Sequence, residues 1–209
     1  MFHFQPPRTD GDERSLRVAV MGGAVCGKTS VVAQYLRQVF LDRYFVTTGE
    51  IHNTTLEVEG KTIDLDIWDT PGGYCFDAAR RYAIQNCDAF LLVYAMNNIA
   101  SFEKAIALQE DIIATRGPVI IVFAGTKADV KHSQWLEHKQ YISYFIGEES
   151  GCTHHEVSAK TGSGISEVFV DIVKQWRKGQ KKPKKSKVPK WLKNGKRALS
   201  EYLRCVTSS

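Results

Sequence analysis

One eight-residue stretch constrains the fold of this chain more than any other. Residues 22–29, Gly22-Gly23-Ala24-Val25-Cys26-Gly27-Lys28-Thr29, fit the pattern G-x-x-x-x-G-K-[ST] of phosphate-binding loops. The apolar residues 16–21 before the loop predict a buried strand, and apolar residues at helical spacing in 28–40 predict a helix. Glycines let the backbone approach phosphates closely, and the loop N–H groups and the helix N-terminus then face an anion. The stretch therefore predicts a site for a nucleotide triphosphate.

The residues of this loop have distinct expected roles. We expect Lys28 to reach the β- and γ-phosphates and the Thr29 hydroxyl to bind Mg²⁺. The remaining residues that we assign to the phosphates are Gly22, Gly23, Ala24, Val25, Cys26, Gly27 and Ser30.

Charge divides the 209-residue chain into a body and a tail. Residues 177–209 contain twelve Lys or Arg residues and one acidic residue, Glu201, although the net charge of the whole chain is only +5. The body is therefore acidic, and a hydrophobic content of 43% is enough for one sizeable core. We predict a disordered segment at 1–15, one nucleotide-binding domain at 16–178 and a basic tail at 179–209.

Hydrophobic periodicity predicts alternating strands and helices after the loop. The predicted strands are 51–59, 62–68, 89–95, 119–124 and 154–157, and the predicted helices are 78–85, 101–115, 133–145 and 163–177. A turn at Gly60-Lys61 joins the first two strands into a hairpin, and Ser101 is expected to cap the helix that follows it. The predicted fold class is α/β, a P-loop NTPase with a mostly parallel central sheet, one antiparallel edge strand and helices on both faces.

Three further clusters fall at the carboxyl ends of predicted strands, where ligands bind in open α/β sheets. Asp69 is placed to bind Mg²⁺ through a water, and the N–H of Gly72 is placed to contact the γ-phosphate. In Thr126-Lys127-Ala128-Asp129, a carboxylate can accept from guanine N1–H and the 2-amino group, which adenine does not offer. In Ser158-Ala159-Lys160, the N–H of Ala159 can donate to guanine O6. These clusters predict a guanine-nucleotide site.

In chain order these motifs resemble those of the Ras superfamily of small GTPases, over about residues 16–178. The stretches Gly72-Gly73-Tyr74-Cys75-Phe76 and 83–90 are most similar to the Ras branch, and within it to the Rhes and Ras-dva type. The resemblance implies that Tyr44-Phe45-Val46-Thr47 is the first switch, that Thr47 binds Mg²⁺ and the γ-phosphate, and that Phe40 packs on the guanine.

The resemblance also implies the activity, a GTP hydrolase that switches between GTP and GDP with bound Mg²⁺. The expected ligands of Mg²⁺ are Thr29, Thr47 and Asp69, and the groups expected to act in hydrolysis are Lys28, Thr47 and Gly72. The base is expected to contact Thr126, Lys127, Asp129, Ser158, Ala159 and Lys160.

Three residues depart from the family pattern. Gly73 stands where most members have the glutamine that orients the attacking water, and Ala24 stands where Ras has a glycine. Both departures predict slow hydrolysis. Val46 replaces the usual proline of the first switch, so that loop is expected to be less stiff. One alternative is that Tyr74 positions the water, and another is an interaction module that stays loaded with GTP and hardly hydrolyses it.

Switch loops of this kind predict protein partners. We expect effectors to bind residues 41–50 and 70–80, with an exchange factor and a GTPase-activating protein as further partners. The chain itself is expected to be a monomer.

The tail predicts contact with an anionic membrane. Residues 189–205 form an expected amphipathic helix, with Trp191 and Leu192 on its apolar face among basic residues. Cys205 lies one residue too far from the end for prenylation and is a candidate for palmitoylation. We expect a cytoplasmic protein on the inner face of the plasma membrane, and nuclear import through the basic tail is the alternative. The tail has no recognised nucleic-acid motif, so no nucleic-acid partner is expected.

Cys152, His154 and His155 lie close together in the sequence. Adjacent residues of a strand point to opposite faces of the sheet, so these three do not predict a zinc site.

Overall fold

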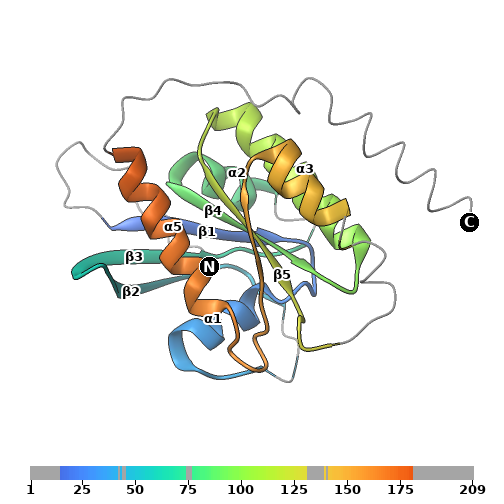
Figure 1. Cartoon of the computed structure of the whole chain (residues 1–209), viewed down its shortest axis with the longest axis horizontal. Helices are drawn as coiled ribbons and strands as arrows, with labels where there is room; N and C mark the ends of the chain where they lie inside the picture. The colour runs from blue at the N-terminus through green and yellow to red at the C-terminus, as the bar shows by residue number, and fades with distance from the viewer. Residues whose placement is uncertain are drawn as a thin grey trace, which may run out of the picture.

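The computed structural model describes residues 15–41, 43, 46–73, 77–130, 139 and 141–180, and it contains one six-stranded sheet (Figure 1). The strands are β1 (Leu16–Gly22), β2 (Glu50–Val58), β3 (Lys61–Asp69), β4 (Ala89–Ala95), β5 (Ile120–Thr126) and β6 (Thr153–Glu156). The helices are α1 (Lys28–Arg37), α2 (Asp77–Asn86), α3 (Ile99–Arg116), the π-helix η2 (Phe145–Ser150) and α5 (Ile165–Gln180). In the described part of the chain, none of these helices is long and apolar enough to cross a membrane.

The sheet has the order β2-β3-β1-β4-β5-β6. Only β2 and β3 pair antiparallel, and the other neighbouring strands pair parallel. The turn between β2 and β3 lies at Glu59-Gly60, both with positive φ, as tight hairpin turns require. The predicted turn was therefore one residue too late. The predicted fold class is confirmed, including the antiparallel edge strand.

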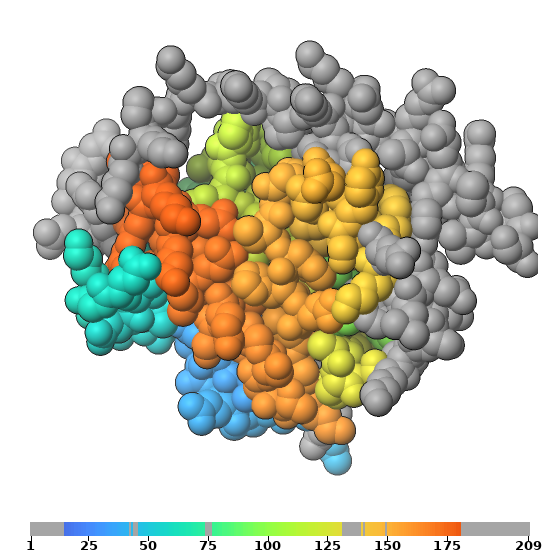
Figure 2. Space-filling view, viewed as in Figure 1, coloured from blue at the N-terminus to red at the C-terminus, as the bar shows by residue number. Residues whose placement is uncertain are grey.

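Helices cover both faces of the sheet and enclose two cores. All seven residues of β1 and all seven of β4 are buried, as expected for central strands covered on both faces. On one face Val18 and Val20 pack against α1 and α5, and on the other face Ala19 and Met21 pack against α2 and α3. In the space-filling view α5 and the segment before it cover the face toward the viewer, beside the β2–β3 turn (Figure 2). Arg177 of α5 donates to the backbone carbonyls of Val58 and Lys61, which lie on either side of this turn.

Helix boundaries differ from the predictions, and α5, for example, spans Ile165–Gln180 rather than 163–177. The first helix ends at Arg37 rather than near Phe40, because Gln38 takes a left-handed φ of 55° and closes the helix with a bond to Gln34. Asn98, not Ser101, caps α3, and its side chain accepts from the N–H of Ser101 at 3.2 Å. In the predicted helix 133–145, residues 133–138 and 140 lie outside the described residues. The chain is helical at 141–144 and continues into η2, which the periodicity did not predict.

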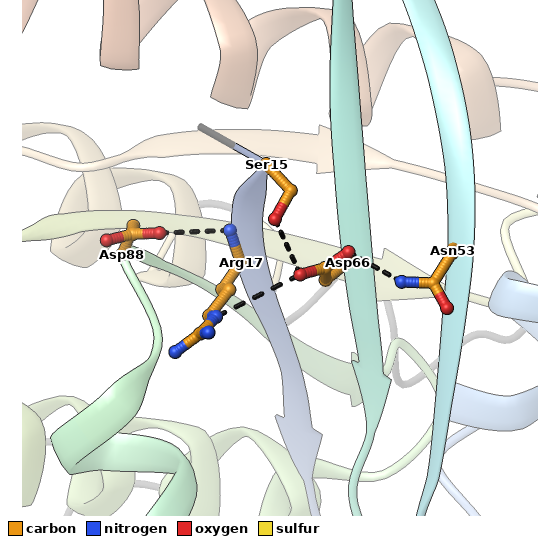
Figure 3. A network of polar contacts seen from close by, with 5 residues as sticks. All are labelled: Ser15, Arg17, Asn53, Asp66 and Asp88. Carbon is orange, nitrogen blue, oxygen red and sulfur yellow. Dashed lines mark hydrogen bonds and ion pairs between the residues drawn. The ribbon is translucent and has the colours of Figure 1, made fainter. Parts of the chain in front are cut away.

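A polar network ties three strands together at the start of β1, away from the phosphate-binding loop (Figure 3). Asp66 of β3 accepts from Ser15 Oγ and from Asn53 Nδ2, both at 2.7 Å, and Arg17 Nε lies 3.9 Å away. The N–H of Arg17 donates to Asp88 at 3.0 Å. These bonds satisfy a carboxylate that lies largely inside the sheet and fix the pairing of β1, β2 and β3.

His154 forms a part-buried polar pair with Tyr94 that predicts a pH dependence of stability. Its Nε2 lies 2.8 Å from the hydroxyl of Tyr94, and burial lowers the pKa of His154 from 6.5 to about 4. Between these values the unfolded chain binds a proton that the folded chain does not. The free energy of unfolding should therefore fall as the pH drops from about 6.5 to about 4, by up to about 3 kcal/mol from this residue.

Denaturant unfolding of wild type and His154→Gln at pH 7 and pH 4.5 would check this expectation. Glutamine can still bond Tyr94 but does not titrate, so the variant should lose less stability than wild type on acidification. Equal losses in the two proteins would show that another group is responsible.

Candidate nucleotide-binding site

The phosphate-binding loop connects the end of β1 to the start of α1, as predicted. Gly27 precedes the helix with a φ of 95°, and no side chain caps the first turn of α1. The first N–H groups of α1 are thus left for a ligand, which is the arrangement that binds anions at helix N-termini. Cys26 is buried in the loop and donates to the carbonyl of Gly23 at 3.0 Å. Burial raises the pKa of the Cys26 thiol, so this group stays protonated and packs rather than reacts.

Lys28 is folded back over the loop. Its side chain is buried, and its Nζ donates to the carbonyl of Gly23 at 2.7 Å. This position holds the ammonium group beside the loop N–H groups, where phosphate oxygens would be bound.

Three side chains from different elements meet beside Lys28. The hydroxyls of Thr29 and Thr47 lie 2.7 Å apart, although 18 residues separate them in the chain. Asp69, at the end of β3, is only 1% exposed, and neither of its carboxylate oxygens has a hydrogen-bond partner among the described residues. Burial raises the pKa of Asp69, and the nearby Thr29 hydroxyl and Lys28 ammonium oppose this rise only in part.

A buried carboxylate without partners is costly unless it coordinates a cation. Two hydroxyls and a carboxylate are oxygen ligands of the kind that Mg²⁺ prefers. Thr29, Thr47 and Asp69 therefore fit a magnesium ion.

Gly72 brings the segment after β3 against the phosphate-binding loop. A Cβ at this position would lie 2.5 Å from Lys28 Nζ, 2.7 Å from the carbonyl oxygen of Gly23 and 2.8 Å from the nitrogen of Ala24. Only glycine allows so close an approach. Thr70 anchors the segment, because its hydroxyl donates to the carbonyl of Val20 at 2.8 Å.

The predicted base-binding residues lie at the ends of β5 and β6. The Ser158 hydroxyl donates to Asp129 Oδ1 at 2.7 Å and accepts from the N–H of Thr161 at 3.2 Å. This chain of bonds orients the carboxylate and leaves its second oxygen for a ligand. Thr126 donates to the carbonyl of Cys26 at 2.6 Å. The part of the site assigned to the base is thus hydrogen-bonded directly to the phosphate-binding loop.

One pocket of about 690 Å³ joins the two ends of the site. Predicted site residues that line it are Val25, Gly27, Lys28, Thr29, Ser30, Phe40, Thr47, Gly72, Thr126, Lys127, Asp129, Ala159 and Lys160. Predicted residues outside its lining are Gly22, Gly23, Ala24, Cys26, Asp69 and Ser158, which lie behind or beside it. Tyr44, Phe45 and the stretch 74–76 lie outside the described residues, so the structure does not place the predicted water-positioning Tyr74.

Glu50 and His52 are among the polar residues of the pocket that the motifs did not predict. They lie 3.5 Å apart at the start of β2, and Glu50 pairs with Asp69 across the hairpin. Counting outward from the Glu59-Gly60 turn gives this pairing, so the hairpin register could have identified Glu50.

Cys152, His154 and His155 do not converge. Cys152 accepts from Gln109, His154 bonds Tyr94, and His155 lies 2.9 Å from Asp171 on α5. Burial by itself would raise the pKa of Asp171. Hydrogen bonds from His155, Thr153 and Gln175 outweigh this effect, so the pKa of Asp171 is lowered.

The strand order, the loop between β1 and α1 and the clusters at the strand ends define a P-loop nucleotide-binding protein. A sequence profile of the Ras family matches residues 17–178. The chain belongs to the Ras family and is a small GTPase by fold and family.

Individual relatives agree with this assignment. The chain is 29% identical over 169 residues to the GTP-binding protein Rhes of Mus musculus, and the same values hold for that of Rattus norvegicus. The GTP-binding protein Rhes of Homo sapiens is also 29% identical over 169 residues. Each alignment covers 75% of this chain and 63% of the relative, so the chain spans less than two thirds of the length of these proteins.

Proposed function

We propose that this protein is a guanine-nucleotide switch that binds GTP and GDP with Mg²⁺ and hydrolyses GTP slowly. One observation carries the proposal. A single pocket runs from Lys28 and Thr29 at the phosphate-binding loop to Asp129 at the carboxyl end of β5. Its volume of about 690 Å³ and its two polar ends suit a nucleotide whose phosphates and base are both recognised.

Each of the pocket residues has a distinct proposed role. Lys28 and the loop N–H groups bind the β- and γ-phosphates, while Asp129 accepts from the guanine. Thr29, Thr47 and Asp69 hold Mg²⁺, which when bound neutralises charge on the phosphates. Gly72 presents its backbone to the γ-phosphate. Residues 41–50 and 70–80 would then change with the presence of that phosphate and bind effector proteins in one state only.

Slow hydrolysis is proposed from the residue at position 73. Gly73 directly follows Gly72 and has no side chain to orient an attacking water. Ala24 is exposed on the phosphate-binding loop, where its methyl group would crowd an arginine supplied by an activating protein. The same two observations support the second candidate function, an interaction module that remains loaded with GTP.

Extraction of the nucleotide from protein purified from cells tests the proposal. GDP is expected for a switch that hydrolyses GTP, whereas GTP would favour the second candidate. Binding of ATP and GTP with equal affinity would contradict both.

Gly73→Gln is expected to raise the intrinsic rate of hydrolysis about tenfold, from a wild-type rate of about 10⁻⁴ per second or less. A glutamine at this place could orient the water, provided that Ala24 leaves room for it. Single-turnover hydrolysis of bound GTP would measure the rate, and the Ala24→Gly, Gly73→Gln double variant tests the steric condition. Gly179→Gln at the open end of α5 is a matched control. A wild-type rate faster than that of unassisted Ras would refute slow hydrolysis.

We further propose an anionic membrane surface as the partner of the tail. Residues 177–209 have twelve basic residues and one acidic residue, and each basic residue near such a surface contributes about 1 kcal/mol. The predicted helix 189–205 and Cys205 lie outside the described residues. Location on the inner face of the plasma membrane follows from this proposal, with nuclear import as the alternative.

An exchange factor and an activating protein are proposed as further partners.

A further inference from the structure

Lys104 of α3 reaches the phosphate-binding site from a helix that the sequence motifs do not include. Its Nζ donates to the carbonyl oxygen of Gly72 at 3.4 Å. Its stem passes the phosphate-binding loop, since the Cδ of Lys104 lies 3.4 Å from where a Cβ on Gly23 would be. One half-buried side chain thus connects α3, the loop and the segment after β3.

Hydrogen bonds and aromatic packing hold the start of α3, from which the Lys104 side chain extends, in a fixed position. Asn98 caps the helix, and the Ser101 hydroxyl accepts from the N–H of Ala95 at 2.9 Å. Phe102 is fully buried, with its ring centroid 5.0 Å from that of Tyr94 and 6.3 Å from that of Phe123. The backbone at position 104 is therefore held in a fixed place relative to β4 and β5.

Two ammonium groups lie at Gly72. Lys28 Nζ lies within 2.5 Å of the Cβ position of Gly72, and Lys104 Nζ bonds the carbonyl of the same residue. Like charges gathered around one residue repel each other unless an anion lies among them. A bond to the Gly72 carbonyl also restricts the movement of Gly72, because it fixes the peptide plane on the C-terminal side of this residue. Both effects favour a γ-phosphate, because Gly72 is the residue that we assign to that phosphate.

We propose that Lys104 is a positioning residue that holds Gly72 for its contact with the γ-phosphate and so favours GTP over GDP. This inference rests on the proposed function, because it requires a guanine nucleotide in the pocket. It assigns to α3 a part in nucleotide discrimination that the loop motifs alone do not provide.

The test compares Lys104→Met with Lys104→Arg. Methionine keeps most of the stem but removes the charge and the donor, and arginine keeps both. Lys61→Met, an exposed lysine at the start of β3, is the matched control. The readout is the dissociation rate of GDP and of a non-hydrolysable GTP analogue from the Mg²⁺-loaded protein.

Lys104→Met should speed dissociation of the GTP analogue about tenfold and leave that of GDP within about twofold. Lys104→Arg should largely restore the wild-type ratio of the two rates, and Lys61→Met should not change it. Equal acceleration of both nucleotides, or no change in either, would overturn the inference while leaving the proposed function intact. A wild-type protein that binds neither nucleotide would overturn both.

Discussion

Asp129→Asn is expected to lower the affinity for GTP and GDP by a factor on the order of 10³ to 10⁴ and to shift preference toward xanthine nucleotides. The carboxylate accepts from two guanine donors, N1–H and the 2-amino group. An asparagine offers one acceptor and one donor instead, so one of these contacts becomes a clash between donors. Xanthine has an oxygen in place of the 2-amino group and can accept from the new amide.

The bond from Ser158 makes this prediction sharper. Ser158 Oγ holds Asp129 Oδ1 at 2.7 Å, so the side chain at 129 keeps its orientation and the substitution alters chemistry rather than position. Equilibrium titration with GDP, xanthosine diphosphate and ADP would measure the shift. Asp111→Asn, on the exposed face of α3, should leave all three affinities unchanged. If Asp129→Asn retained wild-type affinity for GDP, Asp129 would not be the residue that reads the base.

Asp69→Asn is expected to remove most of the effect of Mg²⁺ on nucleotide binding. In the wild type, chelating Mg²⁺ should speed GDP release, whereas losing a group that acts on a metal through its outer ligands costs about tenfold to a hundredfold in metal affinity or activity. In the variant, release should already be fast with Mg²⁺ present, and chelation should add little. Rates of GDP release with and without a chelator measure this directly.

A second measurement separates metal binding from folding. Asp69 is buried with no hydrogen-bond partner among the described residues, so the amide should not destabilise the protein freed of nucleotide and Mg²⁺. Its midpoint of thermal unfolding should be equal to or higher than that of wild type. Asp64→Asn, on an exposed position of the same strand, is the control for both measurements. A variant that still responds to chelation as wild type does would show that Asp69 does not hold the metal.

Local patterns predicted most of the fold. The apolar run at 89–95 has the bounds of β4, and the phosphate-binding loop lies between a strand and a helix as its motif requires. Boundaries that depend on a cap were less accurate. The residue that caps α3 is Asn98, because its side chain can accept from Ser101 while Ser101 itself bonds the end of β4. Asn98 and Ser101 could each cap the helix, and which of them does so depends on where β4 ends.

The candidate site was predictable wherever one short motif holds all the groups that a ligand needs. The loop 22–29 and the carboxylate at Asp129 are of this kind, because spacing and chemistry are local. The contact of Thr29 with Thr47 and the close approach of Gly72 to Lys28 could be expected only from the family resemblance, since each depends on how distant segments pack together.

The amino-acid sequence by itself determined the class of protein, the residue types of the candidate nucleotide site, and the order of strands and helices. Periodicity and glycine spacing are local properties, and they suffice for that. The tertiary structure alone decided the contacts between distant segments: Thr126 with Cys26, Arg177 with Val58, and Lys104 with Gly72. These contacts depend on the packing of helices against the sheet, where small changes in position decide which polar groups come within bonding distance.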